Sequence, residues 1–197
     1  MNLRQLFGLR PPPPAATEWE ERYRRGYAGN ATELAEIGHF ALVAAFVRAA
    51  AGTRPRVLDA GCGRGQLLDH FGEGLLGSYD AFDLSETAIT DARARALKLE
   101  LDPSRVVVAG FDDWKARDTL DAVIFCEALT YAPEPVETLR RFMSHLVPGG
   151  IAVVSLFRNG QAITIGKQLD RSFKVLDQSS VLHSSGKRWD VRLLAQT

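Results

Sequence analysis

The sequence predicts one α/β domain in which helices cover both faces of a mostly parallel sheet. Three short runs rich in apolar residues, at 57–58, 106–109 and 120–125, suit buried strands, and the continuous burial expected for residues 106–109 is typical of parallel strands. Segments with the apolar spacing of helices separate these runs, as in repeated strand-helix-strand units. The length of 197 residues fits a single domain with a three-layer core.

A run of four prolines divides the N-terminal part of the chain. Residues 11–14 are all proline, and such a run forms a stiff, extended spacer that no helix can cross. We therefore expect residues 1–16 to be a flexible tail. The folded domain is expected to span residues 17–197.

Two helices are expected before the first strand. Trp19, Tyr23 and Tyr27 lie at four-residue spacing, which places them on one helical stripe that either packs in the core or covers a ligand site. Asn30 or Thr32 then caps a helix that runs to about residue 50. The residues expected on the buried face of this second helix are Leu34, Ile37, Ala41, Ala44 and Ala45.

The later elements alternate between helix and strand, and alternating polar and apolar residues near the C-terminus predict a hairpin. Ser85 is the expected N-cap of the helix that follows the second strand. The strands expected beside the three apolar runs are 77–83, 151–157, 173–182 and 189–193. The expected helices are 66–71, 85–99, 135–146 and 163–169.

Composition and charge exclude several classes of protein. The 24 basic and 24 acidic residues cancel, so no global field attracts a polyanion and a nucleic-acid partner is not expected. The two cysteines form neither a redox pair nor a zinc pattern, which favours a reducing compartment and predicts the cytoplasm. No apolar run approaches the roughly 18 residues that a membrane span requires, and no secretion signal is expected.

A glycine-rich turn follows the first apolar run. Gly61, Gly63 and Gly65 occupy every second position between this strand and a helical pattern. Glycines allow positive φ angles and bring backbone amides close to a ligand. A helix that starts near Gly65 would add its positive end, which favours an anionic or hydroxyl-rich group. The turn therefore predicts a nucleotide-type cofactor site.

The order of residues in this turn resembles the first motif of the class I S-adenosylmethionine-dependent methyltransferases. Asp59 matches the acidic residue of that motif, and the three glycines match its glycines. A nicotinamide-dependent oxidoreductase is the alternative enzyme, but its G-x-G-x-x-G fingerprint would need a glycine at Gln66. A protein that binds S-adenosylmethionine and regulates without catalysis is a further alternative.

The resemblance extends to three later segments. Asp83, at the end of the second strand, matches the acid that binds the ribose hydroxyls. The segment from Cys126 to Tyr131 resembles the fourth motif, and residues 146–150 match the turn into the fifth strand. The resemblance implies a three-layer, Rossmann-like, doubly wound sheet of seven strands, which is mostly parallel with an antiparallel last strand.

The same resemblance implies which residues bind the cofactor and which act on the substrate. In the turn after the third strand, Phe111 stands where the family commonly has an acid, so either Phe111 packs on the adenine or Asp112 contacts it. Glu127 and Tyr131 are the candidate catalytic residues at the mouth of the site. The candidate cofactor-binding residues are Asp59, Gly61, Cys62, Gly63, Gly65, Asp83, Leu84, Phe111, Asp112 and Cys126.

The predicted activity is methyl transfer from S-adenosylmethionine to a hydroxyl, amine or carboxylate group of a small molecule or glycan. The Asn/Asp-Pro-Pro-Tyr signature of enzymes that methylate nucleobases or glutamine is absent, because Cys126 to Leu129 stands in its place. The four histidines show no metal-binding spacing, so they are expected to pack or to lie on the surface, and no metal is predicted.

Overall fold

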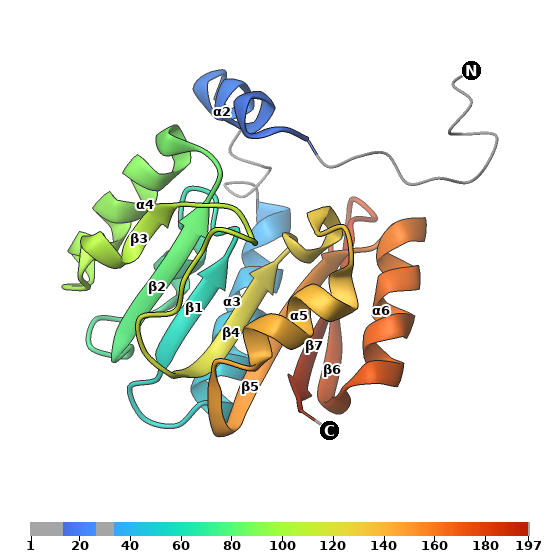
Figure 1. Cartoon of the computed structure of the whole chain (residues 1–197). Helices are drawn as coiled ribbons and strands as arrows, with labels where there is room; N and C mark the ends of the chain where they lie inside the picture. Colours follow the sequence, from blue (N-terminus) through green and yellow to red (C-terminus); the bar gives the residue numbers. More distant parts are fainter. Residues whose placement is uncertain (1–13, 27–33, 197) are drawn as a thin grey trace.

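The computed structural model describes residues 14–26 and 34–196, and it places a seven-stranded sheet between two layers of helices (Figure 1). The strand order is β3-β2-β1-β4-β5-β7-β6, and β7 runs antiparallel to both of its neighbours while the other strand pairs are parallel. This arrangement confirms the predicted fold class and the terminal hairpin. The strands are β1 (Arg56–Ala60), β2 (Ser78–Asp83), β3 (Val106–Val108), β4 (Leu120–Cys126), β5 (Leu146–Phe157), β6 (Lys174–Leu182) and β7 (Arg188–Ala195).

Helices cover both faces of the sheet, which explains the continuous apolar strands. On one face pack α3 (Leu34–Ala50) and α4 (Glu86–Lys98), and on the other pack α5 (Pro135–Met143) and α6 (Gly160–Ser172). Val57 joins the core on the first face and Leu58 the core on the second, and both side chains are fully buried. A strand between two apolar layers has no face left for polar residues.

The remaining helices are short. In Figure 1, α2 (Ala16–Arg24) lies above the carboxyl ends of β1 and β2. The 3-10 helices are η1 (Gln66–His70), η2 (Pro103–Arg105) and η3 (Leu129–Tyr131). Ser85 caps α4 as expected, because its hydroxyl accepts a hydrogen bond from the Ala88 N–H at 3.1 Å. Among the described helices, none has the length and apolar content that crossing a membrane requires.

The prediction for the buried face of α3 is wrong for most of its residues, although Ala44 is buried as expected. The exposed residues include Leu34, Ile37 and Ala41, whereas Val43 and Val47 are fully buried. Apolar residues surround most of this helix, so their spacing does not select one face. The buried face also carries the polar residues Glu36 and His39. Tyr27 and the proposed caps Asn30 and Thr32 lie outside the described residues, as does nearly all of the expected tail.

Two further expectations need correction. Val108 is 43% exposed because β3 is the edge of the sheet and pairs only with β2, so the expected continuous burial of this strand does not hold. The helix after the glycine turn is the five-residue 3-10 helix η1. Since so short a helix has few aligned peptide dipoles, its positive end adds little to the binding of an anion.

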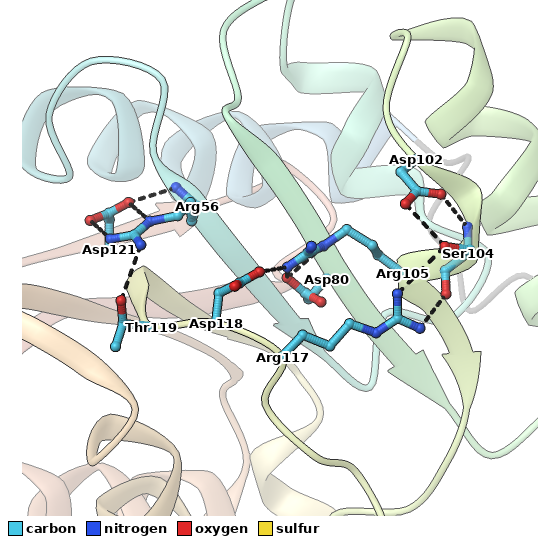
Figure 2. A network of polar contacts seen from close by, with 9 residues as sticks. All are labelled: Arg56, Asp80, Asp102, Ser104, Arg105, Arg117, Asp118, Thr119 and Asp121. Atoms are coloured by element: carbon cyan, nitrogen blue, oxygen red, sulfur yellow. Dashed lines mark hydrogen bonds and ion pairs between the residues drawn. The ribbon is translucent and has the colours of Figure 1, made fainter.

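A network of polar side chains ties together the amino-terminal edge of the sheet (Figure 2). Arg56 at the start of β1 forms a two-pronged ion pair with Asp121 of β4, with contacts of 2.9 and 3.0 Å. Arg105 bridges Asp80 and Asp118, at 2.8 Å each. Asp80 is only 2% exposed, so Arg105 compensates a buried carboxylate. The network therefore stabilises the edge opposite to the glycine turn.

Candidate active site

A cavity of about 400 Å³ opens at the carboxyl ends of β1, β2 and β4. This is the edge of an open α/β sheet where ligands usually bind, and the volume suits a small molecule. Among the predicted site residues, the following line it: Asp59, Gly61, Cys62, Gly63, Asp83, Leu84, Phe111, Cys126, Glu127 and Tyr131. Gly65 and Asp112 do not belong to its lining.

The glycine turn forms the floor of the cavity beside β1. Gly63 has a φ of 54°, and a Cβ atom there would lie 2.8 Å from the Tyr23 hydroxyl oxygen. A side chain at this position would therefore be both strained and sterically blocked. Gly65 instead faces α4, because a Cβ atom there would lie 3.0 Å from the Cα of Ala92. Gly65 lets the turn pack against α4 and is not part of the cavity wall.

Asp83 lies at the end of β2 and is joined to the glycine turn. Its Oδ2 accepts a hydrogen bond from the Gly63 N–H at 3.0 Å, and its Oδ1 accepts one from the Ser85 N–H at 3.0 Å. Burial raises the pKa of this carboxyl above its usual range, and the backbone N–H groups partly oppose that rise. The carboxylate lies in the cavity wall, where its remaining lone pairs can accept hydrogen bonds from a ligand.

Asp59 carries the most unusual carboxylate of the cavity. Its side chain is 1% exposed, and Oδ2 accepts a hydrogen bond from the Tyr79 hydroxyl at 2.8 Å. Oδ1 is buried without a hydrogen-bond partner among the residues that the structure describes. Burial raises the pKa of Asp59 to about 7. An orphaned carboxylate oxygen in a cavity wall is a ready acceptor for a donor group on a ligand.

The turn after β3 places Phe111 and Asp112 in different surroundings. Phe111 lines the cavity and packs edge-on against Phe82, with ring centres 5.8 Å apart. The Asp112 side chain is 85% exposed and forms an ion pair with Arg141 at 2.7 Å. The Asp112 carboxylate therefore pairs with a residue of α5 and does not belong to the cavity lining.

Glu127 and Tyr131 lie at another side of the cavity, after β4. Glu127 has a φ of 60°, and its Oε1 accepts a hydrogen bond from the Trp189 indole N–H. Burial raises the pKa of Glu127 above its usual range, whereas nearby His39 lowers it. Tyr131 meets Trp19 of α2 edge-on, with ring centres 5.0 Å apart.

His39 lies in the cavity wall beside Glu127, which sequence reasoning missed. Its Nε2 lies 3.0 Å from Glu36 Oε2 and 3.4 Å from Glu127 Oε1. Lys187, in the turn before β7, places its Nζ 3.8 Å from Glu36 Oε1. The expected packing or surface role of His39 is therefore incomplete. The Glu-x-x-His spacing in α3 could have indicated that Glu36 and His39 lie together, because residues three apart share a helix face.

Glu36, His39 and Glu127 form the one group of three potential metal-binding side chains within residues 14–26 and 34–196. Each of the three also contacts a protein group, because His39 Nε2 lies within hydrogen-bond distance of Glu36, Glu36 faces Lys187, and Glu127 accepts a hydrogen bond from Trp189. The arrangement therefore needs no metal ion to be stable.

The aromatic stripe of α2 forms part of the cavity wall. Trp19 and Tyr23 both line the cavity. Glu20, on the same helix, accepts hydrogen bonds from the hydroxyls of Ser85 and Thr87, each at 2.6 Å. These bonds lower the pKa of Glu20 to about 2. Of the two alternatives for the stripe, the structure favours a cover over the ligand site.

Comparisons with known proteins agree with this site. Residues 57–150 match a family described as "Methyltransferase domain". No curated protein matches the sequence.

Solved methyltransferase structures share the fold at low sequence identity. The N-methyltransferase NodS from Bradyrhizobium japonicum WM9, in complex with S-adenosylhomocysteine, has 14% identity and a TM-score of 0.73, with 89% of this chain and 97% of that chain covered. The 1,6-didemethyltoxoflavin-N1-methyltransferase of Burkholderia thailandensis has 20% identity and a TM-score of 0.67, with 96% and 93% covered. Magnesium protoporphyrin IX methyltransferase from Synechocystis PCC 6803, with bound S-adenosylmethionine, has 17% identity and a TM-score of 0.61, with 90% of each chain covered.

The matched segment contains the glycine turn, Asp83 and the end of β4, which form part of the cavity wall. Together with the strand order, this match supports a class I S-adenosylmethionine-dependent methyltransferase whose family domain spans the matched segment.

Proposed function

We propose that this methyltransferase methylates an amine nitrogen of a small molecule. The observation that carries the proposal is the charge of the cavity. Asp59 and Asp83 lie on the β1 and β2 side, where we place the cofactor. The carboxylates left to face the acceptor are those of Glu36 and Glu127, with the ammonium of Lys187 beside Glu36. A cavity with this excess of acids attracts a cationic acceptor and repels a carboxylate acceptor.

The residues on the β1 and β2 side of the cavity fit the cofactor. We assign the ribose hydroxyls to Asp83 and the adenine to the wall that contains Phe111. The orphaned Oδ1 of Asp59 suits the ammonium group of the methionine part. Gly61, Cys62 and Gly63 line the cavity beside this carboxylate, and we assign this part of the wall to the methionine part of the cofactor. When bound, S-adenosylmethionine supplies an electrophilic methyl group on a cationic sulfur.

Glu127 is the proposed general base on the acceptor side. A protonated amine must lose a proton before its lone pair can attack, and an ordinary alkylammonium has a pKa near 10. A carboxylate whose pKa is raised by burial is a better base for this proton than an exposed one. An aliphatic hydroxyl is a far weaker acid, so the same carboxylate serves an amine better. Trp19, Tyr23 and Tyr131 border the cavity and exclude water around the acceptor.

The test has two stages. Calorimetry with S-adenosylmethionine, S-adenosylhomocysteine and NAD should show binding of the first two only. Radiolabelled cofactor is then offered with matched sets of small amines, alcohols and carboxylates. We expect label in the amines, and exclusive labelling of alcohols or carboxylates would contradict the proposed acceptor class.

Glu127→Gln keeps the shape of the side chain and removes the base. On the best amine of the panel, we expect turnover to fall by about ten- to a thousand-fold, which is close to the usual contribution of a general base. Cofactor affinity should stay nearly unchanged. Glu137→Gln, on the outer surface of α5, is the matched control. Wild-type turnover and an unaltered pH profile in Glu127→Gln would show that alignment alone drives the reaction.

A further inference from the structure

His39 is held between two carboxylates at the acceptor side of the cavity. Its ring is 1% exposed and stacks on the indole of Trp189, with ring centres 5.0 Å apart and planes at 6°. The stack fixes the plane of the imidazole. Nε2 lies 3.0 Å from Glu36 Oε2, which is a hydrogen-bond contact, and 3.4 Å from Glu127 Oε1, which is an ion-pair contact.

The other ring nitrogen has a neutral partner. Nδ1 lies 3.1 Å from the hydroxyl oxygen of Ser155, which is fully buried on β5, and 3.8 Å from Cys126 Sγ. When Nδ1 carries a proton and donates it to Ser155, the lone pair of Nε2 faces the two carboxylates. Three electron-rich atoms then meet in a poorly hydrated place, and a proton on Nε2 relieves their mutual repulsion.

The other titratable groups around the ring leave this arrangement largely unchanged. Burial raises the pKa of the Cys126 thiol well above its usual range, so that thiol stays neutral. Phe40 stacks on His39, and His70 stacks on Phe40. Burial lowers the pKa of His70, which favours its neutral form. The ammonium group of Lys187 lies beside Glu36, at 3.8 Å, and places a positive charge near the two carboxylates.

We propose that His39 takes the acceptor proton from Glu127, so that Glu36, His39 and Glu127 work as a proton relay. The inference rests on the proposed function and adds to it the group that finally holds the proton. The N–H bond of the acceptor breaks as an O–H bond forms on Glu127. That O–H bond then breaks as an N–H bond forms at His39 Nε2, and no group is oxidised or reduced.

The arrangement explains why a second carboxylate is present. One carboxylate would be enough to orient the imidazole. Two carboxylates at 3.0 and 3.4 Å stabilise the imidazolium formed when the proton arrives, because each adds a favourable charge interaction. Glu36 does not touch the acceptor in this scheme, and its role is to hold the proton on His39. Its other oxygen faces Lys187, whose side chain is 27% exposed.

The relay is tested first without any acceptor. Protein with ¹⁵N-labelled histidine is titrated by NMR between pH 5 and 9, and His70→Asn identifies the His70 signals. In wild type we expect Nδ1 to keep its proton at every pH in this range. In Glu36→Gln and in Glu127→Gln the ¹⁵N shift of His39 Nε2 should differ from its wild-type value at the same pH, since each substitution removes one charge near Nε2. An unchanged Nε2 shift in both variants would overturn the relay, as would one metal ion per chain bound at Nε2.

Activity on the best amine of the panel supplies the second test. His39→Gln keeps an N–H donor near the position of Nε2 and cannot take up a proton. We expect it to lower kcat by about tenfold or more and to change the pH profile, while affinity for S-adenosylmethionine is retained. His70→Asn, outside the cavity lining, is the control and should retain wild-type kcat. Full activity of His39→Gln would show that the ring has a structural role only.

The outcomes separate the two proposals. A wild-type protein that does not bind S-adenosylmethionine, or that labels no amine, contradicts the proposed function whatever the titration of His39 shows. A protein that methylates amines while His39 ignores Glu36 and Glu127 keeps the proposed function and overturns the relay.

Discussion

The backbone N–H of Gly63 donates a hydrogen bond to Asp83 Oδ2 at 3.0 Å, so the glycine turn and the carboxylate at the end of β2 form one unit. Asp83→Ala should weaken cofactor binding by about 1 to 3 kcal/mol, the usual cost of losing hydrogen bonds to a charged group. Calorimetry measures this loss, and a thermal melt checks that the domain still folds. Asp112→Ala is the control, because its exposed side chain lies outside the cavity. Equal affinities of the two variants would contradict the ribose assignment.

Gly63→Val should abolish measurable cofactor binding. A β-branched side chain is strained at a φ of 54°, and its Cβ atom would lie 2.8 Å from the Tyr23 hydroxyl oxygen. The variant should also lower the melting temperature. Gly74→Val is a matched control, because Gly74 also has a positive φ, of 70°, but has open space around it. Retained binding in Gly63→Val would show that the turn is not the cofactor cradle.

Asp59 should make the free energy of unfolding depend on pH. The folded protein holds this proton up to about pH 7, whereas an unfolded chain releases it near pH 4. The stability that Asp59 contributes is therefore fully present below about pH 4 and is lost as the pH rises to about 7. Within that window the slope should reach at most about 1.4 kcal/mol per pH unit.

Urea unfolding at several pH values compares the wild-type protein with Asp59→Asn. The variant lacks the titrating group, so its stability should fall less steeply between pH 5 and 7. Parallel slopes for the two proteins would contradict the raised pKa. Since an ionised Asp59 suits the ammonium group of the cofactor better, wild-type affinity for S-adenosylmethionine should rise over the same range.

Arg105→Ala should destabilise the domain without changing the site. The substitution leaves Asp80, 2% exposed, without its ion-pair partner in the network of Figure 2. Removing one partner of a buried pair costs about 3 kcal/mol. Asp118→Ala removes only the exposed partner of Arg105 and should cost less than about 1 kcal/mol. Equal losses in denaturant unfolding would show that Asp80 is not the residue that Arg105 compensates.

Local patterns predicted the strands and much of the cavity wall. The glycine turn directly follows the run at Val57 and Leu58, and Asp83 ends the adjacent parallel strand. Their positions in the sequence therefore predict that they meet at the same edge of the sheet. The exposure of Val108 could not be predicted in this way. It depends on strand order, which puts β3 at the sheet edge.

The acceptor side of the cavity depends on contacts between distant parts of the chain. His39 meets Ser155 across 116 positions, and Glu127 meets Trp189 across 62. No local spacing contains such pairs. Since α3 has apolar residues on most sides, its sequence did not show which face is buried, and Glu36 and His39 lie on that face.

The hydrogen bonds of Glu20 hold α2 over the cavity. Glu20 is held by the hydroxyls of Ser85 and Thr87 and by the Thr87 N–H, which are neutral groups, although Arg24 lies nearby at 3.0 Å. Its pKa of about 2 keeps the carboxylate ionised throughout the physiological range. Bonds between a carboxylate and neutral donors are screened by salt less than an exposed ion pair is. The position of α2 over the cavity should therefore change little with moderate acidification or added salt.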